Sequence, residues 1–193
     1  MILATTPLLL SIIIVWIENK KIPGKRWYQV SLGILWLLFF PNAMYIVSDL
    51  TYLAAFHPTA WTFDPVTYPH ELVQPGINST IWTDTPILFL SVFNAIILGY
   101  LALRKMQNFI TKKFSVRIGW IFTFITMILA SIGIFLGRFL RLNSWDAVLH
   151  PIGVMSKVSD SAFLSYSAAA FILIYLIIQT TLYLTLVTLE QQN

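Results

Sequence analysis

The chain lacks cysteine altogether and has few charged residues. The absence of cysteine among its 193 residues excludes disulfides, thiolate nucleophiles and cysteine metal sites. Only 10% of the residues are charged, against about 25% in soluble domains. Because 58% are apolar and the mean hydropathy is +0.77, the composition indicates an integral membrane protein. A nucleic-acid partner is not expected despite the net charge of +4, because the sequence offers no basic, polar face.

Five apolar stretches approach the length of about 20 residues that crosses a bilayer. The first lacks the basic start and small-residue cleavage site of a signal peptide, which indicates an uncleaved span. The expected fold class is therefore all-α, a polytopic transmembrane helical bundle formed by one domain, residues 1–193. Its five spans are expected at about residues 1–17, 27–46, 82–103, 118–136 and 162–186.

Lys and Arg are absent from residues 47–81 and gather in two other segments. By the positive-inside rule those two segments are cytoplasmic loops, so the amino terminus is expected outside and the carboxyl terminus inside. The proline- and aromatic-rich residues 47–81 are expected to form an irregular flap on the outer interface. The basic residues of the two loops are Lys20, Lys21, Lys25 and Arg26, and then Arg104, Lys105, Lys112, Lys113 and Arg117.

A first polar cluster ends the second span. Asn42, Tyr45 and Asp49 are spaced i, i+3 and i+7, which places them on one stripe if the helix continues. An amide, a phenol and a carboxylate at the outer end of a bundle suit a cation, a sugar hydroxyl or an arginine. The alternative is helix termination, in which Pro41 kinks the span, Asp49 caps backbone groups and Tyr45 belongs to the interfacial aromatic belt.

A second polar cluster follows the fourth span. Arg138 and Arg141 are spaced i and i+3, with Trp145 a further turn on. Guanidinium groups bind phosphate or carboxylate with two parallel hydrogen bonds, so the pair predicts a site for an anionic lipid or envelope headgroup. Arginines at an outer membrane boundary run against the positive-inside rule, which favours a specific role for them.

A structural role for this cluster stays open. One arginine can form an internal ion pair with Asp49, Asp84 or Asp146. Asn143 followed three positions later by Asp146 also resembles a capping box, in which the acid accepts the backbone N–H of the cap residue. The candidate ligand-binding residues are thus Asn42, Tyr45, Asp49, Asp84, Arg138, Arg141, Asn143, Trp145 and Asp146.

Other polar residues carry weaker signals. The histidines His57, His70 and His150 show no helical metal-ligand spacing, so neither a metal nor a cofactor is predicted. Asn94 and Gln179 lie inside spans, where an amide either lines a path or hydrogen-bonds a neighbouring helix.

The motifs together resemble a bacterial family of predicted membrane proteins catalogued as domain of unknown function 1361. The resemblance covers roughly Pro7 to Asp146, and it implies an all-helical protein of the bacterial cytoplasmic membrane without implying an activity. Members usually have more sequence before the first span, so a truncated amino terminus is expected, and the flap is longer than usual. The matching residues are 35–43 with Tyr45, Asp49 and Leu50, then Trp82, Asp84, Ser91 and Gly99, and finally 137–139 with Arg141 and 143–146.

Three functions therefore remain open from the sequence. The first is a binding or accessory protein whose partners are membrane lipids, with an anionic lipid or envelope precursor held on the arginine pair. The second is an outer-leaflet hydrolase or transferase acting on a lipid-linked substrate, with Asp49 or Asp146 as base or metal ligand. The third is a small transporter or transporter subunit with Asn94 and Gln179 along its path.

Overall fold

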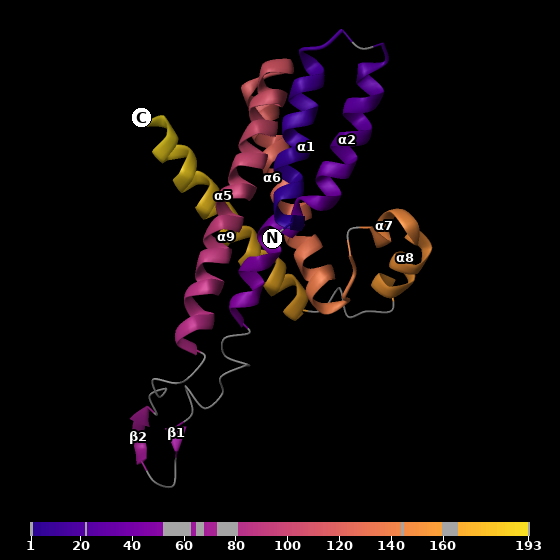
Figure 1. The fold of residues 1–193 in the computed structure, drawn as a ribbon. Helices are drawn as coiled ribbons and strands as arrows, with labels where there is room; N and C mark the ends of the chain where they lie inside the picture. The colour runs from indigo at the N-terminus through magenta and orange to yellow at the C-terminus, as the bar shows by residue number, and fades with distance from the viewer. Residues whose placement is uncertain are drawn as a thin grey trace.

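Long helices dominate the computed structural model, which describes residues 2–21, 23–51, 63–64, 68–72, 81–143, 145–159 and 166–192 (Figure 1). This confirms the predicted all-α helical bundle. Among the described residues, the helices are α1 (Ile2–Glu18), α2 (Lys25–Phe39), α3 (Pro41–Tyr45), the 3-10 helix η1 (Ile46–Leu50), α5 (Ile81–Lys113), α6 (Val116–Phe139), α7 (Asp146–Leu149), α8 (Pro151–Ser159) and α9 (Tyr166–Gln191).

Within the described part of the chain, four helical segments are long and apolar enough to cross a membrane. They are Lys25–Leu50, Trp82–Lys113, Val116–Phe139 and Tyr166–Gln191. The first segment joins α2, α3 and η1, and α1 is a shorter apolar helix beside them. The chain is therefore a membrane protein. The second, third and fourth predicted spans overlap the first three of these segments, residues 166–186 of the fifth lie in α9, and the first lies in the shorter helix α1.

The predicted loop between the third and fourth spans is wrong over most of its length. Residues 104–113 belong to α5, because no glycine or proline interrupts the helix there and basic residues are favoured near a helix carboxyl end. The turn into α6 is short. Ser115 caps α6, its hydroxyl accepting the N–H of Ile118 at 3.3 Å.

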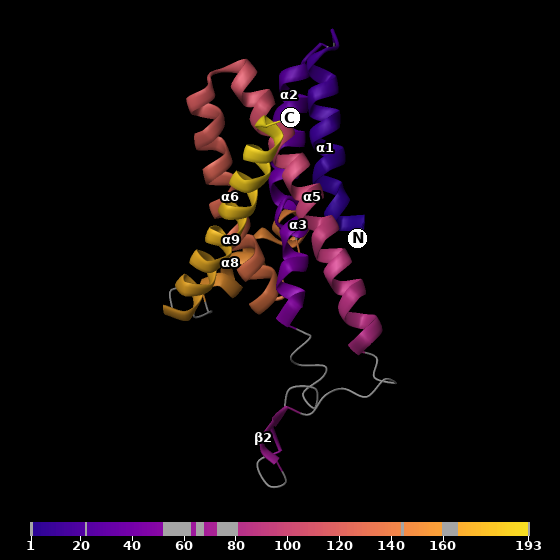
Figure 2. The same ribbon diagram turned by 90° about the vertical axis from the view of Figure 1, so that its left-hand side faces the viewer.

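The predicted flap is not wholly irregular. Two short strands, β1 (Phe63–Asp64) and β2 (Tyr68–Leu72), pair antiparallel with an irregular register. They lie beyond the amino end of α5 in both views (Figures 1 and 2). His57 lies outside the described residues, so its predicted surroundings are untested.

The main core is formed by buried side chains of α1, α2, α5, α6 and α9 together with Phe40. Trp36 is buried there and stacks on Phe40 at 5.0 Å and on Phe122 of α6 at 5.8 Å between ring centroids. Pro41 follows directly and opens α3, so the second span is broken at the predicted proline. Beyond Pro41, α3 packs against α5 and α6 and η1 packs against α5, at the end of the bundle where Asp49 meets Arg138.

Two glycines of α6 permit the close approach of α3. A Cβ atom at Gly133 would lie 2.7 Å from Cγ of Pro41, and one at Gly137 would lie 3.1 Å from Cε2 of Tyr45. Both distances are below an ordinary van der Waals contact. These two glycines, four positions apart on α6, therefore form the surface against which α3 packs.

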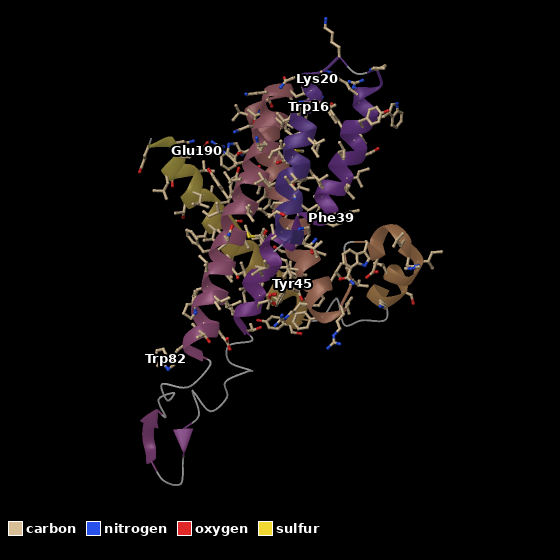
Figure 3. All side chains as sticks on the ribbon, in the orientation of Figure 1. Trp16, Lys20, Phe39, Tyr45, Trp82 and Glu190 are labelled. Atoms are coloured by element: carbon tan, nitrogen blue, oxygen red, sulfur yellow. The ribbon has the colours of Figure 1, made fainter. Side chains whose placement is uncertain are left out.

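The two basic segments lie at the same end of the bundle. Glu18, at the end of α1, contacts Lys25 of α2 at 3.6 Å and Lys113 of α5 at 3.5 Å. Gln29 donates to the same Glu18 carboxylate at 2.7 Å and accepts from Lys113 at 3.3 Å. Lys20 and Glu190 lie toward this end and Tyr45 and Trp82 lie toward the other (Figure 3). We call these two ends the basic end and the Arg138 end.

Candidate functional site

Arg138 forms an ion pair with Asp49 at the Arg138 end. Nη1 of Arg138 donates to Oδ1 of Asp49 at 3.1 Å, and Nη2 donates to Oγ1 of Thr51 at 2.6 Å. The side chains of Arg138 and Asp49 are 16% and 29% exposed, so the pair is largely enclosed. Of the three acids considered from the sequence, the structure gives Arg138 an ion pair with Asp49, which favours the structural reading of this arginine.

Local hydrogen bonds position Asp49 and Thr51, which accept the hydrogen bonds of Arg138. The Ser48 hydroxyl donates to the carbonyl of Tyr45 at 2.6 Å, and the Thr51 hydroxyl donates to the carbonyl of Ser48 at 2.8 Å. These bonds satisfy backbone groups where the chain tightens into η1. Sequence reasoning missed Thr51, and its only signal was a hydroxyl two positions after Asp49.

The stripe predicted for Asn42, Tyr45 and Asp49 does not lie on one continuous α-helix. Asn42 donates to the carbonyl of Phe39 at 3.1 Å, so its amide serves the break at Pro41. Tyr45 is half-buried against Gly137 of α6. These two residues therefore fit the helix-termination interpretation better than a shared ligand stripe.

Tyr175 of α9 adjoins the same region and was not considered from the sequence. It is 9% exposed and belongs to a buried cluster with Met44 and Ile134, against which Tyr45 packs. Its ring stacks on Phe171 at 4.4 Å. A tyrosine inside an apolar span was the available signal, but only the packing of α9 identifies its neighbours.

Arg141 differs from Arg138 in both backbone and exposure. The helix α6 ends at Phe139, and Arg141 has φ 51°, a left-handed conformation uncommon outside glycine. The N–H groups of Leu140 and Leu142 both donate to the carbonyl of Leu136, at 3.1 and 3.4 Å, and close the helix end around it. The two arginines are therefore not neighbours on a helical face, and the exposed one is Arg141.

The residues after Arg141 form the predicted capping arrangement in part. A carboxylate oxygen of Asp146 accepts the backbone N–H of Asn143 at 2.7 Å, and the N–H of Asp146 donates to the Asn143 carbonyl at 3.0 Å. Asp146 thus holds the start of α7. The side chains of Asn143 and Trp145 are exposed beside it.

Asp84 lies on α5, a different helix from those that carry Arg138 and Asp49. It is exposed in the first turn of that helix, where a carboxylate interacts favourably with the helix dipole. The Thr83 hydroxyl donates to its Oδ1 at 3.4 Å. This placement fits the helix-start role that its position suggests.

A second polar network, not considered from the sequence, joins α5 to α9 at the basic end. Glu190 accepts from the Tyr100 hydroxyl at 2.5 Å and from Nε of Arg104 at 2.7 Å. Gln107 accepts from the Tyr183 hydroxyl at 2.6 Å and from Nη1 of Arg104 at 2.7 Å. These hydrogen bonds hold the carboxyl-terminal part of α9 against α5.

The two intramembrane amides face different surroundings. Gln179 is 2% exposed and donates to the Ser131 hydroxyl at 2.9 Å, so it hydrogen-bonds a neighbouring helix. Asn94 is exposed on α5. The two amides therefore have different surroundings in the described structure.

Among the described residues, no group of three His, Asp or Glu side chains is placed to hold a metal ion. His150 is exposed at the end of α7. The side chain of His70 lies outside the described part of the structure. No metal centre is built from the described residues.

Comparison with known proteins gives a family and nothing closer. No curated protein and no solved structure matches the chain. A family model with the description "protein of unknown function (DUF1361)" matches residues 1–182. That range extends beyond the motifs on which the sequence resemblance rests, and it includes α5, α6 and all of the candidate site residues from Asn42 to Asp146. The chain therefore belongs to the DUF1361 family of proteins of unknown function.

Proposed function

We propose that this protein binds an anionic lipid or envelope headgroup at the Arg138 end of the bundle, with Arg141 as the main contact. The observation that carries the proposal is the division of roles between the two arginines. Arg138 is enclosed and paired with Asp49, whereas Arg141 is exposed just past the end of α6. An exposed guanidinium at a membrane boundary suits a phosphate or carboxylate.

Neighbouring groups add to this binding surface. Asn143 and Trp145 follow Arg141 within a turn held by Asp146, and both are exposed. An amide donates and accepts hydrogen bonds, and a tryptophan suits the headgroup layer. In this proposal Arg138, Asp49 and Thr51 fix the end of α6, and thereby the position of Arg141.

The proposed orientation puts this site outside the cell. Most basic residues lie at the opposite end, which the positive-inside rule assigns to the cytoplasm. The family resemblance favours the bacterial cytoplasmic membrane. The headgroup would then belong to the outer leaflet or to an envelope precursor carried there.

The other two functions have less support from the geometry. In an enzyme, Asp49 or Asp146 would be the base or metal ligand. Asp49 instead accepts a hydrogen bond from the Arg138 side chain, and Asp146 accepts one from the backbone N–H of Asn143. Asn94 and Gln179, the proposed path of a transporter, face different surroundings. Neither alternative has a described feature that favours it.

Native mass spectrometry of the gently solubilised protein tests the proposal. The wild type should retain an anionic lipid or precursor, and Arg141→Gln should lose it while remaining folded. Lys157→Gln is the matched control, because it removes one exposed positive charge from α8. A wild type without bound anion, or equal loss in the Arg141 and Lys157 variants, would contradict a specific site.

A further inference from the structure

The side chain of Asn94 is exposed in the middle of the apolar part of α5. Between Asp84 and Arg104 the helix has no charged residue, and Asn94 lies midway, about 15 Å from each at the rise of an α-helix. Among the described residues no hydrogen-bond partner of Asn94 is found. A bilayer offers no water at this depth, so an amide facing lipid carries the cost of an unmade hydrogen bond.

Asn94 belongs to a regular line of exposed side chains, which we call the Asn94 seam. The seam consists of Ile87, Leu90, Asn94, Ile97 and Leu101, spaced alternately by three and four positions. Ile87, Leu90 and Leu101 are 64%, 67% and 43% exposed, and Ile97 is half-buried. This is the a/d spacing along which two helices pack, and a single asparagine in such a line fixes register and partner number.

The bundle uses a different face of the same helix. Val92, Ala95 and Ala102 are buried against the neighbouring helices. Both ribbon views show the amino-terminal half of α5 at the edge of the bundle (Figures 1 and 2). The Asn94 seam is thus available without any rearrangement of the fold.

We propose that the seam is the contact between two copies of this chain, with the two Asn94 amides hydrogen-bonded to each other. All copies insert in the membrane with one orientation, so a twofold axis along the membrane normal makes the two α5 helices parallel. The same residue then meets itself at the same depth. An amide both donates and accepts, so it complements its own copy. This inference is independent of the proposed headgroup site.

Single-cysteine crosslinking in membranes tests the contact directly. The chain has no cysteine, so Leu90→Cys in the full chain carries a single thiol on the seam and leaves the Asn94 amide in place. Mild oxidation should convert this variant into a disulfide-linked dimer. Phe89→Cys is the matched control, since Phe89 is 55% exposed but lies off the seam, and it should crosslink only to background. Equal crosslinking of the two variants, or none at position 90, would overturn the proposal.

The strength of association gives a second measurement. In liposomes of graded protein-to-lipid ratio, single-molecule photobleaching should show the wild type passing from monomer to dimer. Asn94→Leu should weaken dimerisation about 5- to 30-fold, the range that one interhelical amide contact supplies in membrane peptides. Phe89→Leu should leave it unchanged. A wild type that stays monomeric at every ratio, or an Asn94→Leu variant that dimerises equally well, would refute the contact.

Discussion

Nη1 of Arg138 lies 3.1 Å from Oδ1 of Asp49, although the two residues are 89 positions apart in the chain. The pair joins the end of the segment made by α2, α3 and η1 to the end of α6. Thr51 accepts a second hydrogen bond from the same guanidinium at 2.6 Å. One side chain therefore fixes two helix ends at the surface where we propose ligand binding.

The first prediction distinguishes the two arginines by how much each contributes to the stability of the fold. Arg138→Gln should destabilise the fold by about 1–3 kcal/mol, because it leaves the largely enclosed Asp49 carboxylate without its charged partner. Arg141→Gln, at an exposed position, should stay within about 0.5 kcal/mol of wild type. Denaturant unfolding in a mild detergent measures both. If the two variants unfold alike, the structural role assigned to Arg138 is wrong.

The second prediction concerns the close packing of α3 against α6. Gly133→Ala should destabilise the protein by about 1–3 kcal/mol, because the new Cβ would lie 2.7 Å from Cγ of Pro41, a ring that cannot rotate away. Gly33→Ala is the control, since a Cβ there meets nothing within 4 Å, and it should be neutral or slightly stabilising. Thermal unfolding compares them. Equal melting temperatures would mean that α3 does not approach α6 this closely.

More of the fold than of the candidate site could be predicted from the sequence. The length and hydropathy of a span are local properties, and the predicted spans overlap the apolar helices, although the first lies on α1, which is shorter than the four candidate spans. The Asp146 cap was also predictable, because it joins backbone and side chain only three positions apart. The helical continuation to Lys113 was missed because the basic residues were interpreted as a loop, although residues 104–113 contain no glycine or proline.

The arrangement of the site depended on contacts that the sequence does not display. The assignment of Asp49 to Arg138 rests on the break at Pro41, which sets where η1 approaches α6. The exposure of Arg141 rests on where α6 ends, and spacing alone had put it on the helix face of Arg138. Long-range packing decides both, so the candidate residues were identifiable while their roles were not.

The third prediction tests the network at the basic end. Gln107→Leu should destabilise the protein by about 1–3 kcal/mol, because it leaves the Tyr183 hydroxyl without its acceptor in a side chain that is only 3% exposed. Adding Tyr183→Phe should recover part of the loss, because it removes the unpaired hydroxyl, while Arg104, the other partner of Gln107, keeps Glu190 as an acceptor. If the double variant is as unstable as Gln107→Leu alone, the loss of stability comes from altered packing and not from the lost hydrogen bond.

The fourth prediction fixes the orientation on which the proposed function depends. Because the chain has no cysteine, single cysteines report the side of the membrane without background. Lys20→Cys and Phe114→Cys lie at the two turns of the basic end, and a membrane-impermeant maleimide should label them only after the cells are opened. Thr83→Cys, exposed in the first turn of α5, should react in intact cells. The reverse pattern would put Arg138 and Arg141 on the cytoplasmic side, where the positive-inside rule alone accounts for arginine, and the argument for an outward-facing headgroup site would fail.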